Sequence, residues 1–153
     1  MTSEQTLGEQ IGVGQVITQV VRLTNAEIKA LRATPKTLVS GIAGKTIQLV
    51  SATLVLDYAG TNVFSETADN FAIRYTDGSG VIVSQAIETT GFIDQSADTV
   101  TNALPKIDAI VTVAGSKGKA LVLHNTGDGE IAGNAGADNT MKVAVSYIVN
   151  EIN

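Results

Sequence analysis

The sequence predicts an all-β domain, an antiparallel β-sandwich entered through one short helix. Val, Ile, Leu, Ala and Thr dominate a chain of 153 residues that is 44% hydrophobic but only 4% aromatic. β-branched side chains favour a pleated, half-buried surface. Many of the 15 glycines separate apolar runs, where turns are expected. No helix-length period lies between these runs, which disfavours a parallel α/β fold.

The first 23 residues are expected to form an N-terminal arm or first strand ahead of a sandwich domain at 24–153. A polar start leads into an apolar stretch in which two glycines weaken an independent strand. Two interpretations stay open: a frayed tail followed by the first strand of the sheet, or an arm that pairs with a neighbouring subunit. The candidate interface residues of this arm are Ile11, Val13, Val16, Ile17, Val20 and Val21.

A short helix is predicted over 25–33. Thr24 and Glu27 match a capping box, in which each residue satisfies a backbone N–H of the other. Thr34 precedes Pro35, and the residue before a proline is disfavoured in the helical region. Ile28 and Leu31 lie on one face, and so short a helix needs to dock on the domain to be stable.

Seven or eight strands are expected after the helix, joined by turns. Asp77-Gly78-Ser79-Gly80 is a hairpin turn, although it superficially resembles a phosphate-binding loop; it lacks the Lys-Ser/Thr and the helix that such a loop requires. Residues 94–102 are expected to be a loop. The expected strands are 36–39, 45–57, 71–75, 81–87, 105–113, 119–125 and 140–149.

The apolar pattern identifies the inward side of these strands. In 45–57 the pattern changes phase near Ser51-Ala52, which predicts a β-bulge. The residues expected to face the core are Ile47, Leu49, Leu54, Leu56, Phe71, Ile73, Tyr75, Ile107, Ala109, Val111, Val113, Met141, Val143, Val145, Tyr147 and Val149.

Charge and composition exclude several classes of function. The formal net charge is −5, and the ten Lys and Arg residues are scattered, so we expect neither nucleic-acid binding nor a cationic membrane helix. The absence of cysteine excludes disulfides, thiolate metal sites and a Cys nucleophile. The N-terminus lacks the basic and apolar regions of a signal peptide, so a cytosolic origin is expected.

No residue pattern predicts a catalytic or cofactor site. His124 is the single histidine, and it is expected to face outward or to be satisfied at a strand edge. The carboxylates are spread over many turns. The 127–139 loop carries Asp128, Glu130 and Asp138, whose oxygens could hold a cation, but their spacing is not that of an EF-hand. We therefore expect no enzyme activity, no metal and no cofactor.

The layout of 26–149 resembles that of tailed-phage head decoration proteins, also called capsid cement proteins. The elements that carry this resemblance are Glu27–Pro35, Leu-Asp-Tyr-Ala-Gly at 56–60, Ile-Arg-Tyr-Thr-Asp-Gly-Ser-Gly at 73–80, Leu-Val-Leu-His-Asn-Thr-Gly-Asp-Gly at 121–129 and Met-Lys-Val-Ala-Val-Ser-Tyr at 141–147. The resemblance implies a jelly-roll sandwich on the capsid exterior. It also implies a homo-oligomer, as a trimer, with the major capsid protein as partner.

Two other hypotheses remain open. One is another virion part, such as a tail or head-fibre base domain. The other is a carbohydrate-binding sandwich, which would need exposed aromatic side chains to stack on sugar rings. The available aromatic residues are Tyr58, Tyr75, Tyr147, Phe64, Phe71 and Phe92, and three of these are in phase with core positions.

Overall fold

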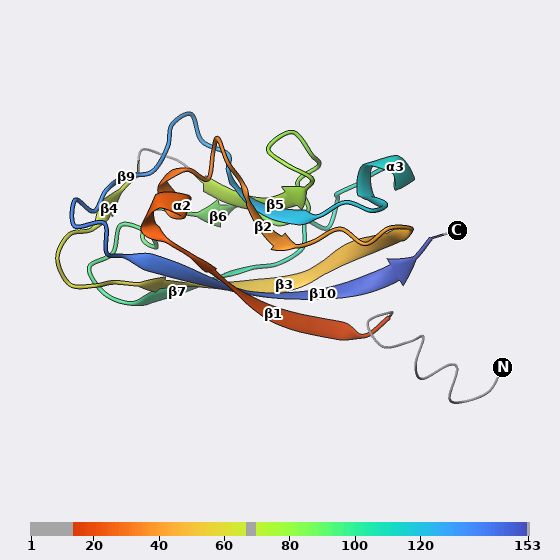
Figure 1. Ribbon diagram of the computed structural model, residues 1–153, viewed down its shortest axis with the longest axis horizontal. Helices are drawn as coiled ribbons and strands as arrows, with labels where there is room; N and C mark the ends of the chain where they lie inside the picture. Colours follow the sequence, from red (N-terminus) through yellow and green to blue (C-terminus); the bar gives the residue numbers. More distant parts are fainter. Residues whose placement is uncertain (1–13, 67–69, 153) are drawn as a thin grey trace.

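The computed structural model describes residues 14–66 and 70–152 as two packed antiparallel sheets, confirming the predicted sandwich (Figure 1). The first sheet has the order β1-β10-β3-β7 and the second has the order β2-β8-β5-β6. The strands are β1 (Val16–Leu23), β2 (Lys36–Val39), β3 (Lys45–Asp57), β5 (Asn70–Tyr75), β6 (Ile87–Glu88), β7 (Thr99–Ala103), β8 (Leu121–Asn125) and β10 (Thr140–Glu151). A separate two-stranded sheet pairs β4 (Phe64–Ser65) with β9 (Ala132–Gly133).

The strand order is that of an eight-stranded jelly roll. The chain passes from one four-stranded sheet to the other between almost all consecutive strands, and only β5 and β6 are neighbours in both sequence and sheet. Such double-sheet architectures bury one face of each sheet against the other sheet. The sandwich therefore has two broad outer faces and two lateral sides.

The core lies between the two sheets and follows the alternation seen in the sequence. Along β10 every second residue is buried, and β3 and β5 show the same inward side. The predicted core residues that the structure confirms are Ile47, Leu49, Leu54, Leu56, Phe71, Ile73, Tyr75, Met141, Val143, Val145, Tyr147 and Val149.

A β-bulge in β3 confirms the predicted change of phase. Ser51 pairs with Ser146, whereas Leu49 pairs with Tyr147, so Val50 is the additional residue. The extra residue moves the inward positions from the odd to the even series. Both Leu49 and Ala52 are buried as a result.

The helix α2 (Asn25–Lys29) begins at the predicted cap and ends earlier than predicted. The Thr24 Oγ1 accepts a hydrogen bond from the Glu27 N–H at 3.3 Å, and the Thr24 N–H donates to Glu27 Oε2 at 2.9 Å. The following residues continue as turns, so the helix spans five residues rather than nine. Ile28 and Leu31 are fully buried, which anchors the segment on the sandwich.

The Asp77–Gly80 turn joins β5 to 81–88, as predicted. The Asp77 carboxylate accepts hydrogen bonds from the Ser79 N–H at 2.8 Å and the Ser79 hydroxyl at 2.6 Å. A Cβ at Gly80 would lie 1.7 Å from the Tyr75 carbonyl oxygen, so the turn requires glycine there. The predicted strand at 81–87 is wrong in its extent: the returning segment pairs with β5 only at a bridge between Arg74 and Ile82 and again at β6.

The region between β6 and β8 departs from the predictions. The predicted loop at 94–102 contains β7, an edge strand paired with β3. The predicted strand at 105–113 is instead a loop leading into a second helical turn, α3 (Val113–Ser116). Ile107 and Val113 are exposed rather than in the core, while Val111 packs partly against it. The sequence does not predict β7, because a strand at the edge of a sheet pairs with one neighbour only and can consist mainly of polar residues.

None of the described helices is long and apolar enough to cross a lipid bilayer.

Candidate functional site

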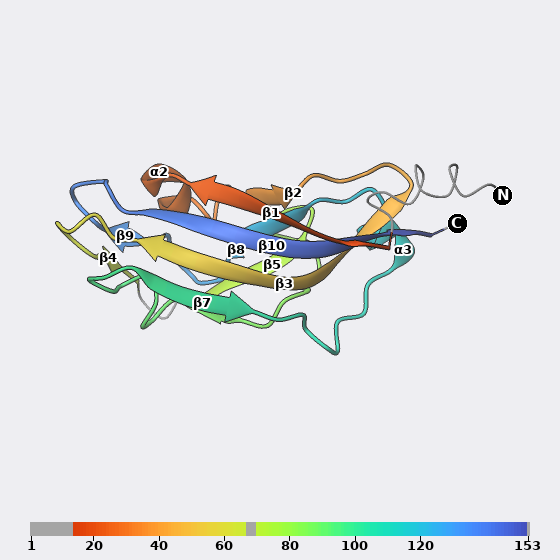
Figure 2. The same ribbon diagram turned by 90° about the horizontal axis from the view of Figure 1, so that it is seen from below.

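The outward side of the sheet β1-β10-β3-β7 is an open surface, called here the outer face. No described element covers this side of the sheet in either view (Figures 1 and 2). The strand registers align small side chains in rows across it, such as Val20, Ala144 and Thr53. Its members are Val16, Thr18, Val20, Arg22, Lys142, Ala144, Ser146, Ile148, Ser51, Thr53, Val55, Val100 and Asn102.

Most side chains of the outer face are short, apart from Arg22 and Lys142, and two pairs of them are hydrogen-bonded. Thr18 Oγ1 and Ser146 Oγ are 2.7 Å apart, and Thr53 Oγ1 donates to Asn102 Oδ1 at 3.0 Å. Short hydroxyl, methyl and isopropyl groups leave little side-chain entropy to lose on contact. The face can therefore approach another surface closely.

β1 forms one edge of this sheet. It pairs with β10 along eight residue positions, and in the described part of the chain no strand pairs with its other side. Val16 and Val20 point outward and are 60% and 59% exposed. A long edge with exposed apolar side chains is a template for pairing with another chain.

The structure separates the predicted interface residues into two groups. Val16 and Val20 lie on the outer face, whereas Ile17 and Val21 pack partly against the core. Ile11 and Val13 lie outside the described residues. The strand itself belongs to the sheet of its own chain.

The remaining members of the outer face were missed from the sequence. Ala144, Ser146 and Ile148 alternate with the buried residues of β10, so their outward orientation was implicit in the pattern. What the pattern could not supply was the pairing of β10 with β1 and β3, which sets these residues beside Val20 and Thr53. Strand pairing between distant segments is a tertiary property.

His124 lies on the side of β8 opposite Leu123, which is in the core, as the alternation predicts. It is nevertheless only 8% exposed, because neighbouring residues cover it. The Arg74 guanidinium donates Nη1–H to His124 Nδ1 at 3.0 Å. Burial, and then the positive charge of Arg74, keep the pKa of His124 below its ordinary value. The turn at Gly78 covers the other ring nitrogen, since a Cβ there would lie 2.8 Å from Nε2. This arrangement is that of a packed, neutral imidazole.

Two of the three candidate carboxylates in the 127–139 loop, Glu130 and Asp138, accept hydrogen bonds from donors of the protein. Glu130 accepts the backbone N–H groups of Arg32 at 3.0 Å and Ala33 at 2.8 Å. Asp138 accepts from the Thr61 hydroxyl at 2.7 Å and from Asn134 Nδ2 at 2.9 Å. In 14–66 and 70–152, no three His, Cys, Asp or Glu side chains gather in a way that could hold a metal ion.

Aromatic side chains are almost entirely in the core. Only Tyr58 is partly exposed. Tyr75 also donates its hydroxyl to the Ile47 carbonyl at 2.5 Å inside the sandwich. The five buried aromatic residues are Phe64, Phe71, Phe92, Tyr75 and Tyr147. A sugar-stacking platform is thus not formed by these rings.

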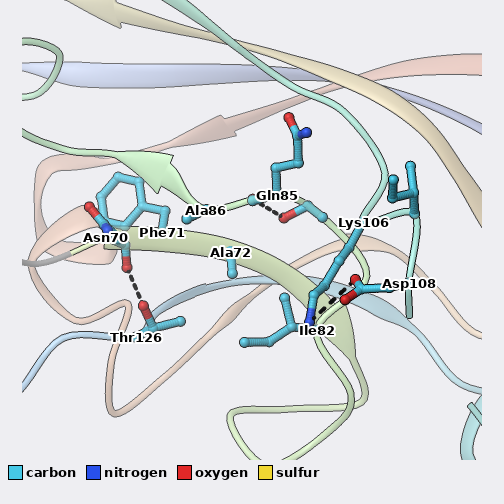
Figure 3. A pocket seen from close by; sticks show the side chains of 11 residues that line it. Asn70, Phe71, Ala72, Ile82, Gln85, Ala86, Lys106, Asp108 and Thr126 are labelled. Atoms are coloured by element: carbon cyan, nitrogen blue, oxygen red, sulfur yellow. Dashed lines mark hydrogen bonds and ion pairs between the residues drawn. The ribbon is translucent and has the colours of Figure 1, made fainter. Parts of the chain in front are cut away.

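A groove lies on the other side of the sandwich, between β5, 82–86, and the loop that follows β7 (Figure 3). Its volume is about 700 Å³. Ala72, Ile82 and Ala86 form apolar parts of the wall, and Lys106 and Asp108 lie at its margin. Asn70, Ser84, Gln85 and Thr126 add polar residues to its lining.

No family model and no curated protein matches the chain. Among solved structures, the chain is similar to one described as the capsid of Ralstonia phage GP4, with 14% identity and a TM-score of 0.40. The similarity covers 92% of this chain and 88% of that one.

Proposed function

We propose that this chain is a structural virion protein that decorates and stabilises a phage capsid by binding between capsomers as an oligomer. The edge of β1, which no described strand pairs with and which adjoins the outer face, carries this proposal. A protein that works by contact needs accessible surface and no catalytic group. The resemblance of the sequence to head decoration proteins supports the same role.

The outer face has the properties that such a role requires. Small side chains allow close approach, and the edge of β1 offers backbone groups for pairing. Symmetric copies bound to a lattice can sum weak single contacts into stable attachment. The net charge of −5 suits the outside of a particle, where the protein does not contact DNA.

The proposal assigns the interface to Val16 and Val20, with Ile11 and Val13 of the preceding segment reaching a neighbour. The partners are further copies of this chain, as a trimer, and the major capsid protein. The location is the capsid exterior, after synthesis in the host cytoplasm. Ile17 and Val21 support this interface by fixing β1 on the core rather than by direct contact.

Binding to capsids that lack the protein tests the proposal. Purified wild-type protein should bind such shells and raise the temperature at which they break. The double variant Val16→Lys/Val20→Lys should bind roughly tenfold more weakly or worse, because charged lysines on an edge strand oppose pairing. Quantitative pelleting of the shells measures the binding.

Val81→Lys is the matched control, since Val81 is 40% exposed but lies on the hairpin away from β1. It should bind like the wild type. Wild-type protein that fails to bind the shells, or a β1 variant that binds as well as Val81→Lys, would contradict the proposal.

A tail or head-fibre base domain would use the same kind of surface. Gold-labelled antibodies on whole particles separate the two roles. Labelling of the head supports decoration, and labelling confined to the tail contradicts it.

A further inference from the structure

The loop after β7 presents apolar side chains directly to solvent. Ile107 is 99% exposed and Ile110 is 91% exposed, and Leu104 and Val113 are more than half exposed. Single exposed apolar residues are ordinary on protein surfaces. Four exposed apolar side chains within ten residues are more than scattered single ones, and they mark this loop as a candidate interaction site.

Backbone hydrogen bonds hold this loop in place. The Lys106 N–H donates to the Val83 carbonyl at 2.8 Å, and the Gln85 N–H donates to the Leu104 carbonyl at 2.9 Å. The Ala109 N–H donates to the Lys106 carbonyl at 3.2 Å, which closes a turn around Ile107. Ile107 is therefore a fixed projection, and its contact with a partner would not need to order the loop.

The projection borders the groove described above. Ile107 itself lines the groove, together with Ala72, Ile82 and Ala86 of the wall. At about 700 Å³ the groove has room for an isoleucine side chain and part of its turn. A projecting apolar group and an apolar hollow thus lie next to each other on one surface.

Opposite charges flank the projection. Lys106 and Asp108 lie on either side of Ile107 in sequence, and Lys106 Nζ is 3.6 Å from Asp108 Oδ1 (Figure 3). Their side chains are 48% and 75% exposed, so this pair contributes little to the fold and is free to exchange partners. A surface with one positive and one negative group beside its axis is complementary to itself when rotated by 180°.

We infer that a second copy of this chain docks on this groove about a two-fold axis. Ile107 of each copy enters the groove of the other, and Lys106 of each pairs with Asp108 of the other. Ile107 borders the groove of its own chain. A two-fold contact therefore fills both grooves of the pair at once, whereas a head-to-tail contact would leave one Ile107 and one groove of each pair unfilled.

This contact is independent of the proposed function and of the β1 surface. Gln19 Nε2 donates to the Leu38 carbonyl, which places β1 beside β2 on one lateral side of the sandwich. β6 lies against β7 on the other side, where the groove is found. A failure of one contact therefore leaves the other unaffected.

Sedimentation of the purified protein over a range of concentrations tests the dimer. Measurements are made in the Val16→Lys/Val20→Lys background so that association through β1 does not contribute. Dimers are expected, and adding Ile107→Ser should weaken them roughly tenfold or more. Ile42→Ser is the control, since Ile42 is also exposed but does not line the groove. A strict monomer, or dimers that are equally strong with Ile107→Ser, would overturn the inference.

Charge reversal tests the two-fold arrangement itself. Lys106→Asp gives a chain with two negative groups beside Ile107, and Asp108→Lys gives a chain with two positive groups. Each variant alone should dimerise roughly tenfold more weakly, and an equimolar mixture should recover dimers. A pairing confined within one chain would not respond to mixing, so a mixture that stays as weak as the separate variants overturns the two-fold contact.

Discussion

At the scale of single residues, Asn134 holds together segments that are far apart in sequence. It is 1% exposed, and its Oδ1 accepts hydrogen bonds from Asn25 Nδ2 at 2.6 Å and from the N–H groups of Asp138 and Asn139, both at 3.0 Å. Its Nδ2 donates to the Asn62 carbonyl at 2.7 Å. Asn134 also has a φ of 41°, a conformation that asparagine tolerates better than most residues.

Asn134→Ala should lower the free energy of unfolding by roughly 2–4 kcal/mol. The reason is that the change leaves the buried Asn25 amide and the Asn62 carbonyl without this partner. Chemical denaturation measures the effect. The exposed Asn102 provides the control, since Asn102→Ala should change stability by no more than about 0.5 kcal/mol. If Asn134→Ala and Asn102→Ala lose the same unfolding free energy, the buried hydrogen bonds of Asn134 do not stabilise the fold.

We expect His124 to make the free energy of unfolding depend on pH near neutrality. Its pKa in the folded protein lies below the ordinary 6.5 because burial and the charge of Arg74 lower it by more than the hydrogen bond with the Arg32 backbone and the charge of Glu130 raise it. As the pH falls, the unfolded chain takes up the proton first. The contribution of the neutral imidazole is therefore complete above pH 6.5 and is lost as the pH falls through 6.5 towards the folded-state pKa.

The comparison of wild type with His124→Gln isolates this contribution. Between about pH 7.5 and pH 5.5 the wild type should lose more unfolding free energy than His124→Gln, because glutamine does not titrate. Urea denaturation at several pH values gives the two slopes. If the unfolding free energies of wild type and His124→Gln change with pH in parallel, His124 does not cause the pH dependence of stability.

At the scale of elements, the capping box of α2 fixes the connection between the two sheets. Thr24→Ala removes the side chain that accepts from the Glu27 N–H, and we expect a loss of about 1 kcal/mol in unfolding free energy. Thermal unfolding is the measurement. Thr37→Ala serves as a control, since Thr37 is exposed on β2. A loss for Thr24→Ala no larger than for Thr37→Ala would exclude a stabilising cap.

The central strands could be predicted from the sequence and the peripheral ones could not. β10 and β3 are buried on one face, so their apolar residues alternate and even the bulge at Val50 leaves a change of phase. β7 forms a strand because β3 lies beside it, and its own residues are mainly polar. The 105–113 segment alternates like a strand, yet Ile107 faces solvent, because alternation cannot distinguish burial in a core from exposure at a contact surface.

The same limit applies to the candidate site. The sequence identifies Val16, Ile17, Val20 and Val21 as one apolar group. It does not show that Val16 and Val20 lie on the outer face whereas Ile17 and Val21 pack against the core. That division follows once the pairing of β1 with β10 sets the register. The groove was not predictable at all, because its walls come from segments that meet only in the folded chain.

At the scale of the whole molecule, the two proposed contacts lie on opposite lateral sides of the jelly roll. β1 bounds one side, and the loop around Ile107 bounds the other. A protomer with contacts on both sides can join neighbours in two directions, as an extended lattice requires. A single self-complementary patch would produce only closed pairs.

The pairing of β1 with β10 also determines how the module carries mechanical load. Val16 lies opposite Ile148, and the Gly14 N–H donates to the Val149 carbonyl, so the chain enters the sheet beside the point where it leaves. Tension between these two ends would open the ladder one residue pair at a time, since the hydrogen bonds of antiparallel strands run perpendicular to them. Tension across the sheet, from β1 towards β7, is shared by all the hydrogen bonds of each ladder at once. We therefore expect the β1–β10 ladder to resist tension across the sheet better than tension between these two ends.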